Sequence, residues 1–289
     1  KDGWELLTIA APCCRNLAVS LFRDRACDEI EAAPGVIVRS WRDAAHPNAG
    51  ARALRVAAHS LALFDESFGS YPFREFDVVA SAQGEDVGGM EATGLVLIDA
   101  QAYELCEHLP DATGVEALPV LMLSETIAHE VAHQWWYGLV GNDAFAEPWL
   151  DESLTNWSGG WALEKAGGAA ARLGALNIAF LSVRMHAAGQ TKAMDLPLSG
   201  FADMNEYGSV VYGRGELMWE ALRKRLGDER FLAFLRTHHA RHRFGVLDAA
   251  DLHGQFVEAL GAEEAAAFTA AWVRGDGLTT KMLLDSLKP

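Results

Sequence analysis

The amino-acid sequence predicts an α+β fold in which strands come first and helices follow. Two observations support this prediction. Short β-prone runs lie within the first hundred residues, whereas from about residue 118 onward apolar residues recur with helical spacing. Strands and helices that occupy separate parts of a chain are typical of α+β domains. At 289 residues, half of them hydrophobic, the chain is long enough to bury a substantial core.

The elements expected before residue 118 follow from local patterns. In chain order they are β-prone runs at 17–22 and 35–41, a helix over 51–69, and buried strands at 76–82 and 94–100. The turn-rich segment "HPNAG" at 46–50 precedes the helix, and we expect a domain boundary near residue 45. The later helical part is expected to break at Gly167-Gly168, across 188–208, at Gly227-Asp228 and at Gly245.

Charge and hydropathy exclude two classes of partner. Forty acidic against 24 basic side chains give a net charge of −16, which repels the phosphates of nucleic acids and anionic lipids. No uninterrupted apolar run reaches the 18 or more residues of a membrane-spanning helix. We therefore expect neither nucleic-acid binding nor a membrane span in this chain.

The four cysteines show no CxxC spacing, and two of them, Cys13 and Cys14, are adjacent. Adjacent cysteines seldom bond to each other, and a chain of this length does not need a disulfide framework. Free thiols in a reducing, cytoplasmic compartment are the expectation, with a disulfide framework as the less favoured alternative.

The segment "SETIAHEVAHQWWYGLV" at 124–140 carries polar groups inside an otherwise apolar helical pattern. On a helix His129 and His133 lie one turn apart and about 40° apart around the axis, so that both imidazoles can share one metal ion. Glu130 projects beside this pair and out of line with it. That position suits a base acting on water at the metal better than a third ligand.

A third ligand must come from elsewhere, because catalytic zinc sites commonly use two histidines and a carboxylate. Glu152, in "EPWLDESLTNW", lies in the first turn of a second predicted helix near Pro148, a residue favoured at helix starts. An HExxH pattern arises by chance on the order of once in forty chains of this composition, so the nearby second helix strengthens the prediction. The alternative of two buried structural histidines would require further buried hydrogen-bond partners.

Four ordered motifs resemble the M1 family of zinc aminopeptidases, the gluzincins. HEVAHQWW, followed after eighteen residues by the glutamate of WLDES, is similar to the family pattern of HExxH, eighteen residues and Glu. "VGGMEATG" at 87–94 resembles the G-x-M-E-N substrate strand, and "VVYGRGELMWEAL" at 210–222 resembles the Y-x-K-G helix start. With the closing segments, the resemblance covers roughly residues 44–278.

The resemblance implies a fold, a cofactor and an activity. The fold would be a thermolysin-like metallopeptidase catalytic domain, with a small mixed sheet followed by a mostly helical part. One zinc ion would be held by His129, His133 and Glu152, and Glu130 would be the general base. The implied activity is hydrolysis of the N-terminal peptide bond of peptides that have a free N-terminus.

The remaining roles are carried over from the same motifs. Tyr212 would donate a hydrogen bond to the developing oxyanion, and Glu91 would bind the free α-ammonium group of the substrate. The backbone of Gly88, Gly89 and Met90 would pair with the substrate as an added strand.

The sequence offers two further candidate site residues, and it departs from the family pattern at three positions. Asn156, one helical turn after the third ligand, is a candidate to orient a metal ligand, and Tyr207 is a candidate lining residue with packing as an equal alternative. Ala92 and Asp151 stand where the family has asparagine, and Arg214 stands where it has lysine. None of these changes removes a ligand or the base, although Ala92 removes a polar group beside the amine-binding glutamate.

The resemblance also implies a domain division. Residues 44–289 would form the thermolysin-like zinc metallopeptidase domain, and residues 1–43 would be remnant strands of an N-terminal β-domain. In full-length members that domain closes one side of the cleft and adds a contact to the substrate amine. The start at Lys1, without a leader, is typical of a fragment or a processed product. Because most of the N-terminal domain is missing, we expect the chain to bind zinc but to turn over peptides weakly.

Alternatives to the aminopeptidase remain open at this point. One is a zinc endopeptidase or other hydrolase on the same scaffold, and another is a non-catalytic binding or scaffold protein that keeps the fold. The histidines at 238, 239 and 242 have loose metal-like spacing, but arginines at 236, 241 and 243 surround them. We interpret that cluster as a solvated face or a helix C-terminus.

Overall fold

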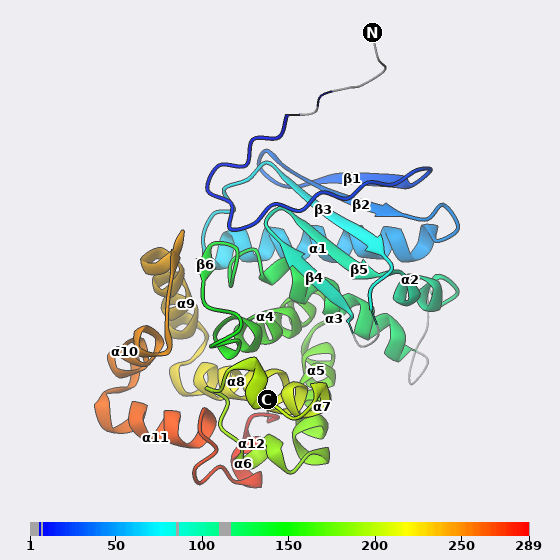
Figure 1. Ribbon diagram of the computed structural model, residues 1–289. Coiled ribbons are helices and arrows are strands. Elements are labelled where there is room, and N and C mark those ends of the chain that lie inside the picture. The colour runs from blue at the N-terminus through cyan, green and yellow to red at the C-terminus, as the bar shows by residue number, and fades with distance from the viewer. Residues whose placement is uncertain (1–5, 7, 85–86, 110–116, 289) are drawn as a thin grey trace.

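A small mixed sheet followed by a mostly helical part makes up the structure (Figure 1). The computed structural model describes residue 6 and residues 8–84, 87–109 and 117–288. The predicted α+β class, with strands first and helices after, is confirmed. Among the described residues no helix has both the length and the apolar character that crossing a membrane requires.

The sheet has five strands in the order β1-β2-β3-β5-β4. Their bounds are Ala26–Ala33 (β1), Val36–Arg42 (β2), Glu75–Ser81 (β3), Gly89–Ala92 (β4) and Leu95–Asp99 (β5). The three central strands are parallel, whereas β1 and β4 run antiparallel to their neighbours. Since β4 is the last strand in this order, its outer edge has no strand partner within the described part of the chain.

The helices follow and interleave with the sheet. Their bounds are Pro47–Phe68 (α1), Ala100–Glu107 (α2), Leu118–Ala132 (α3), Trp149–Gly167 (α4), Ala169–Met185 (α5), Ala188–Thr191 (α6), Met204–Tyr207 (α7), Gly215–Leu226 (α8), Asp228–His242 (α9), Ala249–Leu260 (α10), Ala262–Trp272 (α11) and Thr280–Asp285 (α12). A 3-10 turn spans Leu198–Gly200, and a π-helical segment spans Gly208–Arg214. The short strands Val140–Gly141 (β6) and Gly245–Val246 (β7) pair in parallel.

The core runs from the sheet through α1, α3 and α4 to α8 and the later helices (Figure 1). Helix α1 forms here because its apolar residues recur every three or four positions, and Leu61, Phe64 and Phe68 are fully buried. Phe64 packs edge-on against Trp135, and Phe68 stacks near Trp161, with ring centroids 5.6 Å apart in each pair. This aromatic cluster fixes α3 and α4 side by side, and those two helices carry the predicted metal ligands.

One expected strand is wrong. Residues 17–22 form no strand, and Leu17, Val19 and Leu21 are exposed. The run has a β-prone composition, but its apolar side chains are exposed, so little burial stabilises a strand there, and the position beside β2 is occupied by Ala26–Ala33. The strands expected at 35–41, 76–82 and 94–100, and the helix expected over 51–69, are present as β2, β3, β5 and α1.

The sheet crosses the boundary expected near residue 45. Strands β1 and β2 lie before that position, and β2 pairs in parallel with β3, for example Val38 opposite Phe76. Within this chain, therefore, the N-terminal strands belong to the same sheet as the later ones. The division into residues 1–43 and 44–289 stays a prediction.

Candidate metal centre and substrate cleft

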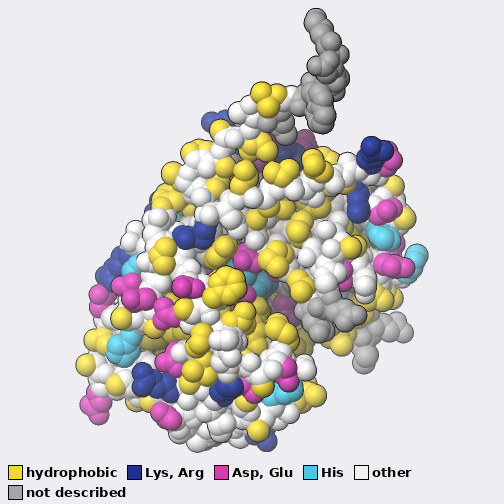
Figure 2. Space-filling model, in the orientation of Figure 1, with side chains coloured by type: hydrophobic (Ala, Val, Ile, Leu, Met, Phe, Trp, Pro, Cys, Tyr) yellow, Lys and Arg dark blue, Asp and Glu magenta, His cyan; other side chains and the backbone are white. Residues whose placement is uncertain are grey.

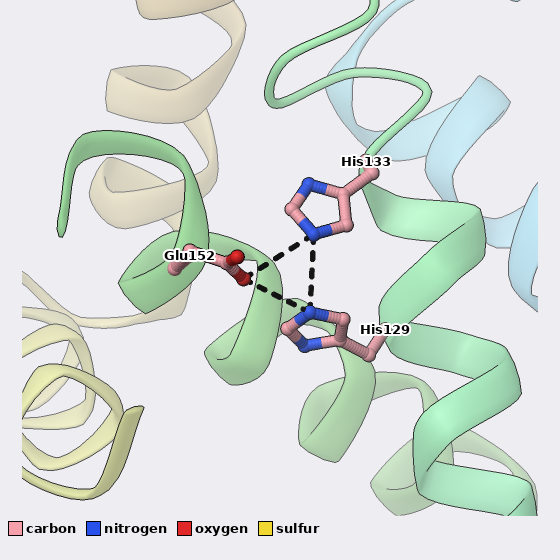
Figure 3. Close-up of side chains that lie close together, drawn as sticks. All are labelled: His129, His133 and Glu152. Atoms are coloured by element: carbon pink, nitrogen blue, oxygen red, sulfur yellow. Dashed lines mark hydrogen bonds and ion pairs between the residues drawn. The ribbon is translucent and has the colours of Figure 1, made fainter. Parts of the chain in front are cut away.

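The two histidines of the HExxH segment and Glu152 converge on one point (Figure 3). His129 lies in the last turn of α3, His133 caps that helix, and Glu152 lies in the first turn of α4. Nε2 of His129 is 3.1 Å from Nε2 of His133, and Oε2 of Glu152 is 3.2 Å and 3.3 Å from these two atoms. Three potential ligand atoms thus form a nearly equilateral triangle.

The triangle fits a zinc ion. Tetrahedral ligands about 2.0–2.1 Å from zinc lie about 3.3–3.4 Å from one another, close to the separations found here. Nδ1 of His133 is 3.0 Å from the carbonyl oxygen of Trp136, which can only accept, so Nδ1 carries the hydrogen and Nε2 presents its lone pair. A nitrogen lone pair facing a carboxylate oxygen is satisfied by a cation or a shared proton. Oε2 of Glu152 is itself buried and has no hydrogen-bond donor among the described residues.

Burial and neighbouring charges shift the pKa values of the metal ligands. Burial lowers the pKa of His129, so its imidazole is neutral, as a metal ligand must be. Burial would lower the pKa of His133, but the Glu152 carboxylate outweighs burial and raises that pKa well above its ordinary value. Burial would likewise raise the pKa of Glu152, but the positive charge on His133 outweighs it and holds that pKa below its ordinary value. The carboxylate is therefore ionised in the metal-free site, ready to bind a cation.

Close packing of α3 against α4 brings Glu152 to the histidines. A Cβ at Gly159 would lie 3.1 Å from the backbone nitrogen of His129, so glycine allows the two helices to approach. Trp136 donates its indole N–H to Oγ of Ser158 at 2.9 Å, and Oγ1 of Thr155 lies 3.3 Å from Nδ1 of His133. The helix pair is thus fixed on both sides of the metal ligands.

Glu130 lies beside the triangle, as its position on the helix predicts. Its side chain is buried, and Oε2 has no partner among the described atoms. The backbone of β4 approaches so closely that a Cβ at Gly89 would be 2.3 Å from Oε1, which leaves room only for glycine. Burial raises the pKa of Glu130 to about 8, which suits a general base near neutral pH.

Tyr212 lies on the other side of the histidines, in the π-helical segment Gly208–Arg214. Its ring stacks on that of His129 with centroids 5.7 Å apart, and the ring of Tyr207 packs against it edge-on at 5.5 Å. Burial raises the pKa of Tyr212 well above its ordinary value, so the phenol keeps its proton and remains a hydrogen-bond donor. π-Helical turns of this kind frequently occur at functional sites.

All the residues that the sequence assigns to the site line one cavity of about 800 Å³. Glu91, on the edge strand β4, has a carboxylate oxygen within 4.8 Å of ligand atoms of Glu130 and His133. The lining includes Gly88, Gly89, Met90, Glu91, His129, Glu130, His133, Glu152, Asn156, Tyr207 and Tyr212. Segments from β4, α3, α4 and the π-helical segment therefore meet around the metal triangle.

Comparisons with known proteins identify the family of this chain. The profile described as "Peptidase family M1 domain" matches residues 52–272. The chain belongs to peptidase family M1.

Relatives extend this family assignment. "Aminopeptidase 2" of Candida albicans is 23% identical over 253 residues, covering 84% of this chain and 26% of the relative. "Aminopeptidase M1-B" of Oryza sativa subsp. japonica is 27% identical over 252 residues, covering 84% and 27%. The chain thus spans about a quarter of the length of these M1 relatives.

A solved structure of the family has the same fold. The M1 zinc metallopeptidase of Deinococcus radiodurans superposes with a TM-score of 0.62 at 20% identity, covering 88% of this chain and 52% of that protein. A mutant of that metallopeptidase bound to a Tyr-Ser-Ala substrate superposes with a TM-score of 0.61. The thermolysin-like fold class expected from the sequence is confirmed.

The side chain of Asn156 makes no described hydrogen bond to a metal ligand. Its amide nitrogen donates to Oε2 of Glu216 at 2.9 Å, and Glu216 in turn accepts from Arg172 at 2.7 Å. The residue next to it, Thr155, is the one that reaches an imidazole. The predicted orienting role of Asn156 therefore lacks a direct contact, although the residue lines the cleft.

The sequence did not reveal the residues that hold the turn after β4. Nε2 of Gln134 donates to the carbonyl oxygen of Ala92 at 2.9 Å, and Oε1 accepts from N–H of Gly94 at 2.8 Å. Oδ1 of Asn16 accepts from the backbone N–H of Thr93 at 2.8 Å and from its hydroxyl at 3.2 Å. This turn directly follows Glu91, the predicted amine-binding residue. By holding the turn, Gln134 and Asn16 position the Glu91 carboxylate.

Arg15 connects the N-terminal segment that contains Asn16 to the loop after α3 and to β7. Its guanidinium donates to the carbonyl oxygens of Tyr137 at 2.5 Å and Gly245 at 2.7 Å. A Cβ at Gly141 would fall 2.0 Å from the guanidinium carbon, so the arginine lies directly on that glycine. Residues 15 and 16 lie outside the matched family segment, and no local pattern in the sequence indicates their role.

Replacing Asn16 by alanine is expected to raise KM for a peptide with a free amine by about tenfold, because two hydrogen bonds to the turn after Glu91 are lost. Bound zinc should stay at one equivalent, since Asn16 touches no ligand. Steady-state kinetics and metal analysis measure the two quantities, with the exposed Asn177→Ala as the control. An unchanged KM in Asn16→Ala would remove Asn16 from the substrate site.

The histidine cluster of α9 differs from the expectation in one respect. It lies at a helix C-terminus, as expected, but His238 and His239 are 2% and 3% exposed, so the interpretation as a solvated face is wrong for them. Gln255 accepts from Nδ1 of His238 at 2.9 Å and donates to Nε2 of His242 at 2.8 Å. The buried imidazole of His238 also packs near Trp136. Hydrogen bonds and aromatic contacts make burial favourable for His238, whereas Nε2 of His239 is buried without a hydrogen-bond partner among the described residues.

Proposed function

We propose that this chain forms the catalytic part of a zinc aminopeptidase that acts on peptides with a free N-terminus. The observation that supports it best is the short distance between Glu91 and the metal site, with a carboxylate oxygen within 4.8 Å of ligand atoms of Glu130 and His133. A carboxylate at that position can bind an α-ammonium group while the adjacent peptide bond lies at the metal. Relatives of which the chain spans about a quarter are named aminopeptidases, which agrees with the proposal.

The chain's own residues would perform the proton transfers and hold the substrate. When bound, zinc supplies Lewis-acid polarisation of the scissile carbonyl and lowers the pKa of the attacking water. Glu130 accepts a proton from that water and passes it to the leaving amine. The Tyr212 hydroxyl donates a hydrogen bond to the carbonyl oxygen as it gains negative charge.

The edge strand β4 would align the peptide. Its outer edge has no strand partner among the described residues, so the backbone of Gly89 and Met90 can pair with an extended substrate. Glycine at position 89 also keeps the strand against the Glu130 carboxylate. The scissile bond is thereby held between the base and the metal ligands.

Comparing one short peptide with its N-acetylated form tests the proposal. Chelator-sensitive cleavage of the free-amine peptide, with at least a hundredfold lower kcat/KM for the acetylated one, is expected because the half-buried Glu91 carboxylate would lose its cationic partner in the acetylated peptide. Equal cleavage of both peptides would favour an endopeptidase. Cleavage of neither by this chain, but of the free-amine form by a longer version of the protein, would show that an upstream domain completes the cleft.

An upstream domain is part of the proposal. Large apolar side chains on the N-terminal segment and β1 are exposed, among them Leu17 at 58%, Leu21 at 89% and Ile30 at 47%. Figure 2 shows hydrophobic side chains spread over this upper part of the molecule. A further β-domain packed here would cover them and close the cleft at its amine end.

We also propose a reducing, cytoplasmic location. The four cysteines have free thiols, and Cys13 and Cys27 are exposed. Exposed thiols persist as thiols where glutathione and thioredoxin keep them reduced.

A further inference from the structure

The cleft is lined by more carboxylates than the proposed reaction uses. Five glutamates line it, and no lysine or arginine does so among the described residues; the glutamates are at positions 91, 125, 130, 152 and 216. In the proposed reaction Glu91 binds the substrate amine, Glu130 transfers the proton and Glu152 is a metal ligand. Glu216 is occupied by Arg172 at 2.7 Å and Asn156 at 2.9 Å. Glu125 is left without a role, and no side-chain hydrogen bond or ion pair is described for it.

The position of Glu125 places it on the leaving-group side of the cleft. It lies four residues before His129 on α3, and therefore on the same face of that helix. Going from Glu91 back along β4, Gly89 faces Glu130, and a Cβ at Gly88 would lie 3.6 Å from Thr126. The residues of a substrate that follow the scissile bond would thus extend from the metal toward Thr126 and its neighbour Glu125.

The charges around Glu125 favour a cation. Arg172 already forms ion pairs with Glu216 at 2.7 Å, Glu220 at 2.8 Å and Glu164 at 4.0 Å, so one guanidinium serves three carboxylates before Glu125 is counted. Arg223 also pairs with Glu164 and Glu220, which leaves Glu216 with Arg172 as its one described ion-pair partner. Burial raises the pKa of Glu125, and it raises the pKa of Glu216 to about 8. A second positive charge entering this end of the cleft would compensate carboxylates that are costly to keep ionised.

The walls suit a long basic side chain. Met122, one helical turn before Glu125, and Ile178 on α5 line the same cavity. Their apolar surfaces can cover the methylene stem of a lysine or arginine while the charged end reaches the carboxylate.

We propose that Glu125 binds the basic side chain of the residue that follows the scissile bond, so that peptides with lysine or arginine in second position are preferred. The inference rests on the proposed aminopeptidase function, because the direction of the substrate is set by its amine at Glu91. It adds the substrate class to that function.

The test compares two peptides that differ by one charge, Ala-Lys-Ala and Ala-norleucine-Ala. The zinc-loaded protein is expected to show a kcat/KM about tenfold higher for the lysine peptide, the effect of one charged hydrogen bond. Glu125→Gln should bring this ratio close to one, whereas the exposed Glu66→Gln should keep it. Using the ratio makes the result independent of small differences in folding or metal content.

Two kinetic outcomes would overturn the proposal: a ratio near one in the unaltered protein, or a tenfold ratio that survives in Glu125→Gln. Cleavage of neither peptide would count against the proposed function, and binding then decides this inference. Calorimetry with zinc-loaded Glu130→Gln should give a Kd about tenfold lower for the lysine peptide, and that difference should vanish when Glu125→Gln is added. Equal Kd values for the two peptides would reject a basic pocket whatever the activity.

Discussion

Replacing Glu130 by glutamine is expected to lower kcat by about a thousandfold while one equivalent of zinc stays bound. Glutamine has the shape of glutamate, so it fits against Gly89, where a Cβ would be only 2.3 Å from Oε1. It cannot accept the proton of the attacking water at neutral pH. The ligand atoms of His129, His133 and Glu152 are untouched by the change.

Peptide hydrolysis and zinc content, measured on the same preparation, separate the possible outcomes. The exposed Glu66→Gln serves as a control, since it makes the same chemical change far from the cleft. Loss of both activity and zinc would mean that Glu130 supports the metal site instead of the proton transfer. Activity within tenfold of the unaltered protein would rule out Glu130 as the base.

Removing a metal ligand is expected to abolish both tight zinc binding and peptide hydrolysis. His133→Ala deletes one corner of the ligand triangle and leaves the Glu152 carboxylate, 3.3 Å from Nε2 in the unaltered protein, without that neighbour. Zinc affinity should fall by more than about a hundredfold, the loss typical of residues that merely orient ligands. Peptide hydrolysis should fall to background.

The melting temperature gives an independent measure of the same effect. Chelation should lower Tm of the unaltered protein, because zinc stabilises the folded state that binds it. Tm of His133→Ala should not respond to chelator, whereas His253→Ala, an exposed histidine whose Nδ1 contacts Thr269, should behave like the unaltered protein. A full equivalent of tightly bound zinc in His133→Ala would show that the metal lies elsewhere.

The metal centre could be predicted from sequence because its geometry is local. The helical period places His129 and His133 on one face, and the apolar pattern around them predicts the helix on which that reasoning depends. Glu152 required a further step, since its approach depends on the packing of a second helix. The resemblance to the M1 family supplied that step, and the triangle of 3.1–3.3 Å distances agrees with it.

Contacts between distant segments could not be predicted. Asn16 and Thr93 are separated by 77 positions, and their hydrogen bonds depend on how an extended segment without regular structure lies across the sheet. The β-prone run at 17–22 forms no strand because strand formation depends on burial against neighbouring segments, which composition does not reveal. His238 was misjudged because its buried partner, Gln255, belongs to the next helix.

In the π-helical segment before α8, the number of residues determines how Tyr207 is oriented relative to Tyr212. Its i→i+5 hydrogen bonding accommodates one residue more than an α-helical turn would. Deleting a single residue between Gly208 and Tyr212 would let the segment relax into an α-helix, and each preceding residue would then rotate by about 100° relative to α8. Tyr207 would turn away from Tyr212 even though both tyrosines were still encoded. Insertions and deletions are therefore expected to be excluded from these few positions.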